Sequence, residues 1–157
     1  MPGNRRHGNG ALILARLLLL SVLVTACGVV RPETRTLRIH TAAGTTVNYH
    51  VEVATTSARQ HRGLMFRKSM TPDHGMLFVY HRSQTLYMWM KNTYLPLDML
   101  FIDEHGRIAT IAAHARPLNT DIISSGTPVR AVLELNAGEA DRHGVKVGDR
   151  VEWGERQ

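Results

Sequence analysis

The sequence predicts a mainly β protein, a compact antiparallel barrel-like or sandwich domain with one or two short helices. Short segments that alternate apolar and polar residues recur along residues 36–154, turn residues separate them at short spacing, and only two stretches suit a helix. Of the 157 residues, 43% are hydrophobic and 20% are charged. These values are typical of an ordinary globular chain of one domain.

Residues 1–26 do not fit that domain and are predicted to be a signal peptide. Arg5, Arg6 and Arg16 occur there without any acidic residue, and the apolar run 17–24 follows the last of them. A run of this length is too short for a comfortable membrane span and is typical of a signal peptide. The mature protein is therefore expected to be exported.

The segment "VTAC", residues 24–27, places an aliphatic and two small residues before the only cysteine of the chain. This arrangement resembles the lipobox of bacterial lipoproteins, which implies cleavage before Cys27 and acylation of its thiol. The partner of Cys27 would then be a membrane, because several acyl chains anchor a protein firmly. An ordinary cleaved signal with a chance cysteine, or an uncleaved anchor, is the alternative.

Residues 27–35 are interpreted as a tether between this anchor and a domain over residues 36–154, since Pro32 and mixed charges occur there without periodicity. Gly28 replaces the aspartate associated with retention at the inner membrane in enteric-type bacteria. We therefore expect the domain to face the periplasm from the outer membrane.

Removal of the three arginines of residues 1–26 leaves 16 basic and 13 acidic residues, so the formal charge falls from +6 to +3. The longest basic run of the mature chain is the pair Arg67 and Lys68. Neither feature is typical of a nucleic-acid-binding surface. Nucleic acid is therefore not expected as a partner.

The first half of the domain is predicted to begin with a hairpin of residues 36–41 and 46–53 around Gly44. A short helix should follow, with Thr55 or Thr56 as its N-cap and Gly63 as its end. Separate strands are then predicted over 76–80 and 86–91.

The second half is predicted to continue with strands over 97–103 and 105–114. Residues 115–128 are rich in turn formers and are expected to be a long surface loop. A strand over 129–135, a helix over 137–143 and a last strand that ends at Trp153 complete the pattern.

The common catalytic motifs are not found in the sequence. It contains no GxSxG elbow, P-loop, GxGxxG fingerprint or HExxH zinc motif, and an acylated Cys27 could not act as a nucleophile. No cofactor is therefore expected. One metal hypothesis is that Met88 and Met90, on one face of a strand, bind Cu(I), although core packing is the simpler role for them.

The polar residues near the apolar block 86–103 are the candidate site. Asp98 should be buried among aliphatic residues, and an ionised buried carboxylate needs a partner. Arg67, Lys91 and Asn92 are the candidates nearest in element order, together with Arg62. A structural role for Asp98 at the bend around Pro96 is the favoured alternative. Glu134 is expected on the solvent face of its strand.

Five segments carry a resemblance to a known family: "RGLMFRKSM", "GMLFVY", "MWMKNTYLPLDMLFID", "VLELNAG" and "GVKVGDRV". In this order and spacing they resemble the bacterial and archaeal domain of unknown function 192 family, over residues 37–153. The resemblance implies a compact, mainly β domain and no particular reaction. Many members have "PC" where this chain has Pro117 and Leu118, so a thiol-dependent role is doubtful here.

Three functions follow as hypotheses. The first is an exported, lipid-anchored module without enzymatic activity that binds a small ligand or an envelope protein. The second is an enzyme with an acid-base or sugar-processing site around Lys91, Asn92 and Asp98. The third is the periplasmic Cu(I)-binding protein that uses Met88 and Met90.

Overall fold

The computed structural model describes residues 34–154, so the predicted signal peptide, Cys27 and nearly all of the predicted tether lie outside the described residues. The described part is mainly β, with two short helices, as predicted. Its elements in chain order are β1 (Thr34–His40), β2 (Thr46–Ala54), α1 (Ser57–Arg62), β3 (His74–Met88), β4 (Leu97–Ile102), β5 (Ile108–Ala115), β6 (Ile123–Asn136), α2 (Glu139–Arg142) and β7 (Arg150–Trp153).

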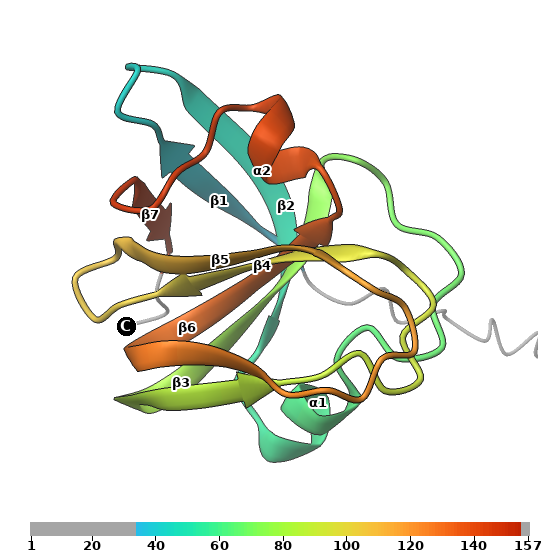
Figure 1. Ribbon diagram of the computed structural model, residues 1–157. Helices are drawn as coiled ribbons and strands as arrows, with labels where there is room; N and C mark the ends of the chain where they lie inside the picture. The colour runs from blue at the N-terminus through green and yellow to red at the C-terminus, as the bar shows by residue number, and fades with distance from the viewer. Residues whose placement is uncertain (1–33, 155–157) are drawn as a thin grey trace, which may run out of the picture. The chain divides into compact units, whose positions relative to one another are not determined.

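The seven strands form one sheet in the order β5-β4-β6-β3-β2-β1-β7, which curls into a half-barrel (Figure 1). An isolated bridge between Arg107 and Arg150 brings the two ends of this order together. Main-chain hydrogen bonds of 3.0 Å from Ile108 to Asp149 and of 2.7 Å from Val151 to Gly106 support this contact. Pairing of this kind shields strand edges that would otherwise be exposed.

The predicted hairpin is confirmed, because β1 and β2 pair antiparallel with Ile39 opposite Val47. The next connection departs from an all-antiparallel pattern, since β2 and β3 are parallel neighbours. Helix α1 lies in the crossover between them, as parallel strands require a long connection. Its ends agree with the prediction: the Thr56 side chain accepts a hydrogen bond from the Arg59 N–H, and Gly63 is the C-cap.

Two predicted boundaries are wrong. The strands expected over 76–80 and 86–91 are one long strand, β3, which ends at Met88, and register shifts interrupt its pairing with β6. The loop expected over 115–128 is shorter, because β6 begins at Ile123 and continues through the turn formers. In both places long-range pairing between β3 and β6 overrides the local signals, and a bulged ladder accommodates residues that do not alternate.

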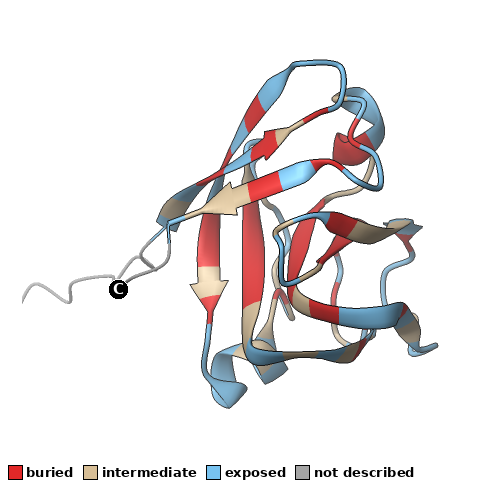
Figure 2. Cartoon of the chain, turned by 90° about the vertical axis from the view of Figure 1, so that its left-hand side faces the viewer, coloured by how far each residue is buried: buried red, intermediate tan, exposed pale blue. Residues whose placement is uncertain are grey.

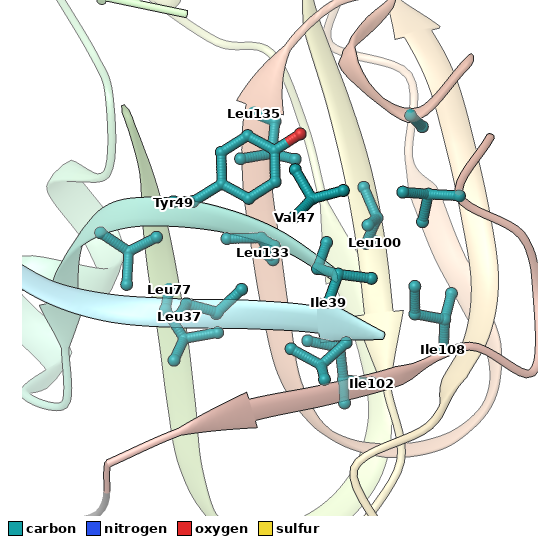
Figure 3. Packing of buried hydrophobic residues seen from close by; sticks show 14 of the residues in the cluster. Leu37, Ile39, Val47, Tyr49, Leu77, Leu100, Ile102, Ile108, Leu133 and Leu135 are labelled. Atoms are coloured by element: carbon teal, nitrogen blue, oxygen red, sulfur yellow. The ribbon is translucent and has the colours of Figure 1, made fainter. Parts of the chain in front are cut away.

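Apolar side chains pack on both faces of the central strands. The first cluster lies inside the curl and includes Leu37, Tyr49, Leu100 and Leu133 (Figure 3). The second lies on the opposite face and includes Phe78, Met99 and Val132, under segments that also bury Leu64 and Met90. Buried residues accordingly occupy the strands, while exposed residues dominate the turns and α1 (Figure 2). Strands β4 and β6 are therefore covered on both sides.

Among the residues that the structure describes, none of the helices has the length and apolar character needed to cross a membrane.

Candidate functional site

A row of four residues crosses the centre of the sheet on the face of the second cluster. Glu52 of β2 pairs in register with Met76 of β3, Met76 pairs with Glu134 of β6, and Glu134 pairs with Met99 of β4. Residues paired in register project from the same face of a sheet. The sheet therefore places two carboxylates on one apolar face, separated by a methionine.

Glu134 is buried, with only 4% of its surface exposed, so its predicted place on the solvent face is wrong. The alternation in "VLELN" separates the two faces of β6 correctly. It does not reveal that the segments after α1 and β3 cover the second face. An antiparallel strand commonly has one solvated face, but here segments that bury Leu64 and Met90 cover the second face, and Glu134 is enclosed.

Arg67 reaches this row from the segment that follows α1. Its guanidinium donates one hydrogen bond to each carboxylate oxygen of Glu52, at 2.5 and 2.8 Å. This two-point geometry is the strongest form of an arginine-carboxylate pair. The bond from Glu52 is also the main reason why the pKa of Arg67 is raised above its ordinary value. The charge of Arg67 is thus already balanced.

Glu134 has no comparable partner: within residues 34–154, no donor hydrogen-bonds to its carboxyl group. Burial raises the pKa of Glu134 to about 8, and the nearby charge of Arg67 opposes this shift only in part. The carboxyl group therefore keeps its proton at neutral pH and can donate a hydrogen bond as well as accept one.

Glu134 lines a cavity of about 320 Å³. The cavity lies between α1, β3 and the turn after β3, and we call it the Glu134 cavity. Phe78, Tyr80, Tyr87 and Trp89 supply its aromatic walls. Its volume is at the lower end of the range of about 300–1,000 Å³ that is usual for small-molecule sites.

Several polar groups of the Glu134 cavity are held in place by the fold. The Nε2 atom of Gln60 donates to the carbonyl oxygens of Ala54 and Val79, which leaves its Oε1 atom uncommitted among the described residues. Thr93 is buried, and its hydroxyl donates to the Lys91 carbonyl at 3.2 Å. Burial and the charge of Glu134 raise the pKa of Tyr80, so its hydroxyl stays protonated. The wall therefore presents neutral donors and acceptors.

A second hollow, of about 480 Å³, lies near the contact between β7 and the turn before β5. Its polar lining includes Arg38, His105 and Arg150, which are exposed. Arg150 pairs with Glu152 at 3.1 Å. Exposed charges of this kind are the ordinary surface of a protein, whereas the Glu134 cavity contains a buried acid. The Glu134 cavity is therefore the stronger candidate site, although it is smaller.

Asp98 is fully buried, as predicted, but it lies on the other face of the sheet. Its Oδ1 atom accepts the N–H of His114 at 2.9 Å, and its Oδ2 atom accepts those of Gly138 at 2.9 Å and Ala140 at 3.0 Å. The predicted structural role is therefore the one seen, although the amides come from distant segments and not from the bend at Pro96. No cationic side chain of residues 34–154 pairs with it.

Lys91 and Asn92 do not converge with Asp98. The Lys91 ammonium group is exposed and lies 5.2 Å from the centroid of the Trp89 ring. Asn92 has φ of 55°, a turn conformation that asparagine tolerates well, and its carbonyl accepts the Phe66 N–H at 2.8 Å. The structure thus separates the predicted site: Arg67 and the turn lie at the second cluster, and Asp98 lies at the first.

The two methionines of the copper hypothesis differ in environment. Met88 lines the Glu134 cavity, whereas Met90 follows the end of β3 and is completely buried in the second cluster. Within residues 34–154, no group of three or more histidine, cysteine, aspartate or glutamate side chains is arranged to hold a metal ion. Packing in the core accounts for Met90.

Comparisons with known proteins identify a family and no activity. The model of the family DUF192, "Uncharacterized ACR", matches residues 38–153. No protein with curated annotation matches the chain.

Two solved structures are similar to the chain. One, from Sinorhizobium meliloti 1021 and described as a proposed transcription regulator, is 49% identical with a TM-score of 0.77, covering 80% of this chain and 98% of its own. Another, from Novosphingobium aromaticivorans DSM 12444 and described as a protein of unknown function, is 38% identical with a TM-score of 0.74, covering 76% of this chain and 85% of its own.

Proposed function

The chain belongs to the domain of unknown function 192 family, and we propose that this member is an exported, lipid-anchored module that binds a small ligand in the Glu134 cavity. The observation that carries the proposal is the carboxyl group of Glu134. Glu134 is buried and lines the cavity, and no donor of the described residues hydrogen-bonds to its carboxyl group. Glu134 is largely shielded from water, so a ligand that hydrogen-bonds with its carboxyl group would be favoured.

The sequence supports the anchor. The basic residues and the apolar run of residues 1–26 precede the lipobox-like segment "VTAC" directly, and Cys27 is the only cysteine. An unpaired thiol is unusual in an exported domain, whereas an acylated cysteine has no free thiol. The outer membrane, with the domain in the periplasm, is the proposed location.

Metabolic labelling with a palmitate analogue tests the anchor. The wild-type chain should incorporate label and Cys27→Ser should not, while the neighbouring change Gly28→Ala should leave labelling intact. Incorporation of label by Cys27→Ser would disprove acylation at this residue.

The cavity is tested by a thermal-shift screen of a diverse small-molecule library against the full-length chain. Glu134→Leu fills the same space without a hydrogen-bonding group, and removal of an unpaired buried acid should not weaken the fold. Ligands of the cavity should stabilise the wild type and Glu104→Leu, a matched change at an exposed acid, but not Glu134→Leu. If every stabilising compound acts equally on all three proteins, the cavity is not the binding site.

Acid catalysis in the same cavity is a second candidate function. A carboxyl group that keeps its proton at neutral pH is suited to act as a general acid. Glu52, the other carboxylate of the row, is engaged by Arg67 and does not line the cavity, so a paired base is not at hand. Catalysis would appear as turnover of a bound ligand that Glu134→Gln abolishes while binding is retained.

A role in transcription, as described for the Sinorhizobium meliloti structure, has less support in this chain. Its basic residues are scattered, and the proposed export would remove the domain from the genome.

A further inference from the structure

The chemistry of the Glu134 cavity restricts the class of ligand that it can take. Its most buried polar residue, Glu134, is uncharged at neutral pH, and Arg67 beside it is neutralised by Glu52. The remaining fixed charge of the wall belongs to Arg62, an exposed residue at the end of α1 whose field is screened by water. The interior of the cavity is therefore electrically neutral.

A cationic ligand is disfavoured by two features. Binding of a cation against Glu134 would require its carboxyl group to ionise in the buried site, beside Arg67. In addition, one face of the Trp89 ring is already covered, because the Lys91 ammonium group lies over it at 5.2 Å from the centroid. An external cation would have to compete on that face with a cation of the same chain.

An anionic ligand is disfavoured by the pairing of Arg67. A carboxylate or phosphate placed against Glu134 would need a cation to balance it, and both terminal nitrogens of Arg67 donate to Glu52. His61 and Arg62 could attract an anion only at the exposed mouth of the cavity. Enclosing an anion deeper in the cavity without a partner would be costly.

The walls suit a ligand that is neutral, flat on one side and rich in hydroxyl groups. Tyr87 and Trp89 are large aromatic side chains that remain 66% and 40% exposed, so their rings are available at the edge of the cavity. The Glu134 carboxyl group and the Tyr80 hydroxyl can donate and accept hydrogen bonds, and the Thr93 hydroxyl, which donates to the Lys91 carbonyl, can accept one. Apolar ring faces beside neutral hydrogen-bonding groups match the two kinds of surface on a pyranose.

We propose, on the basis of the ligand-binding function above, that the Glu134 cavity binds an uncharged saccharide unit. The apolar face of the sugar ring packs against Tyr87 and Trp89, and its hydroxyl groups hydrogen-bond with Glu134, Tyr80 and Thr93. The cavity volume of about 320 Å³ suits one ring or two, so the ligand is a short sugar or the end of a longer glycan.

Probes that share one ring and differ in charge test this class. The full-length chain is titrated by ligand-observed NMR at about pH 6.5, where Glu134 keeps its proton and most of the amine of glucosamine is charged. The neutral probes are N-acetylglucosamine, glucose, galactose and cellobiose, the cationic probe is glucosamine, and the anionic probe is glucuronate. At least one neutral sugar should bind, about tenfold or more tightly than either charged sugar.

Variants locate the binding. Tyr87→Ala and Glu134→Leu should each lower the affinity for the neutral sugar by about tenfold. Tyr94→Ala should not, because Tyr94 is 46% exposed but does not line the cavity, which makes it a matched control for Tyr87. Glu134→Gln, which keeps a neutral donor and acceptor, should retain most of the affinity.

If Tyr94→Ala weakens binding of the neutral sugar as much as Tyr87→Ala does, the assignment to this cavity is overturned. Tighter binding of glucosamine or glucuronate, lost in Glu134→Leu, would overturn the ligand class and leave the proposed function standing. If no sugar binds and the library screen finds no ligand that depends on Glu134, both proposals fail.

Discussion

The guanidinium group of Arg67 donates two hydrogen bonds to Glu52 and none to Glu134, although the charge of Arg67 is felt at both carboxyl groups. Arg67 and Glu52 thus form a closed pair, and Glu134, on the other side of Met76, is left as a neutral acid in the wall of a cavity. This unequal division of one cation between two acids determines the electrostatics of the candidate site.

Glu134→Gln should change how stability depends on pH. The pKa of Glu134 is about 8 in the folded chain and near 4.3 when unfolded, so between these values the folded state holds a proton that the unfolded state releases. The stabilisation is therefore present below about pH 4.3 and is lost as pH rises to 8. The Glu134→Gln protein has no such loss. Its free energy of unfolding, compared with that of the wild type, should therefore increase by about 1 kcal/mol per pH unit across this window.

Urea denaturation at several pH values between 5 and 8.5 measures this difference. The charged groups that face Glu134 are Arg67 from the segment after α1 and, at the mouth, His61 and Arg62, and they remain in both proteins. For Glu104→Gln, a change at an exposed acid, the curve of stability against pH should be parallel to that of the wild type. Parallel curves for Glu134→Gln as well would show that Glu134 is ionised in the folded chain.

Arg67→Met should destabilise the domain and raise the pKa of Glu134 further. Glu52 would lose both hydrogen bonds while its side chain remains 12% exposed, at a cost of about 1–3 kcal/mol, since Arg67 itself is 35% exposed. In the wild type the charge of Arg67 lowers the pKa of Glu134, so this pKa should rise when the charge is removed. Carbon-detected NMR of the glutamate carboxyl groups reports the second effect.

Arg59→Met is the matched control for Arg67, because Arg59 is exposed on α1. It should leave both the stability and the pKa of Glu134 unchanged. A Glu134 pKa that is the same in Arg67→Met and the wild type would contradict the coupling between the two residues.

Asp98→Asn should be strongly destabilising. The carboxylate accepts three main-chain N–H groups from separate segments, and an amide would turn an NH₂ group toward at least one of them. We expect the free energy of unfolding to fall by about 3 kcal/mol. Asp103→Asn is the comparison, because Asp103 also accepts two main-chain N–H groups but at a more exposed turn, and its cost should be smaller. Equal losses of stability in the two variants would mean that burial of Asp98 does not increase the cost of its substitution.

Gly75→Ala should disturb the site through the backbone. A Cβ atom on Gly75 would lie 2.6 Å from the carbonyl oxygen of Glu134 and 2.8 Å from a Leu135 methyl group, so β3 and β6 would have to separate. A loss of about 1–3 kcal/mol is expected, with weaker ligand binding in the cavity. Gly154→Ala, where nothing lies within 4 Å, should be neutral in thermal unfolding. A stable Gly75→Ala protein would show that the two strands yield more easily than their spacing suggests.

Local patterns were sufficient to predict a large part of the fold. Alternation along 36–53 predicted the β1–β2 hairpin, and the aliphatic neighbours of Asp98 predicted its burial. Thr55 or Thr56 and Gly63 were predicted as the ends of α1, and the structure has Thr56 and Gly63 there. These features depend on residues that are close in sequence, where side-chain period and capping preferences act directly.

The tertiary structure alone decided the candidate site. Alternation around Glu134 shows which residues share a face, but only the packing of distant segments determines that this face is covered. The bond from Arg67 to Glu52, like the parallel pairing of β2 with β3, joins residues that local propensity does not bring together. The sequence by itself therefore determined the first hairpin, the ends of α1 and the family. Long-range pairing determined which acid is neutralised and which one remains free in the cavity, because burial and charge balance are properties of the assembled sheet.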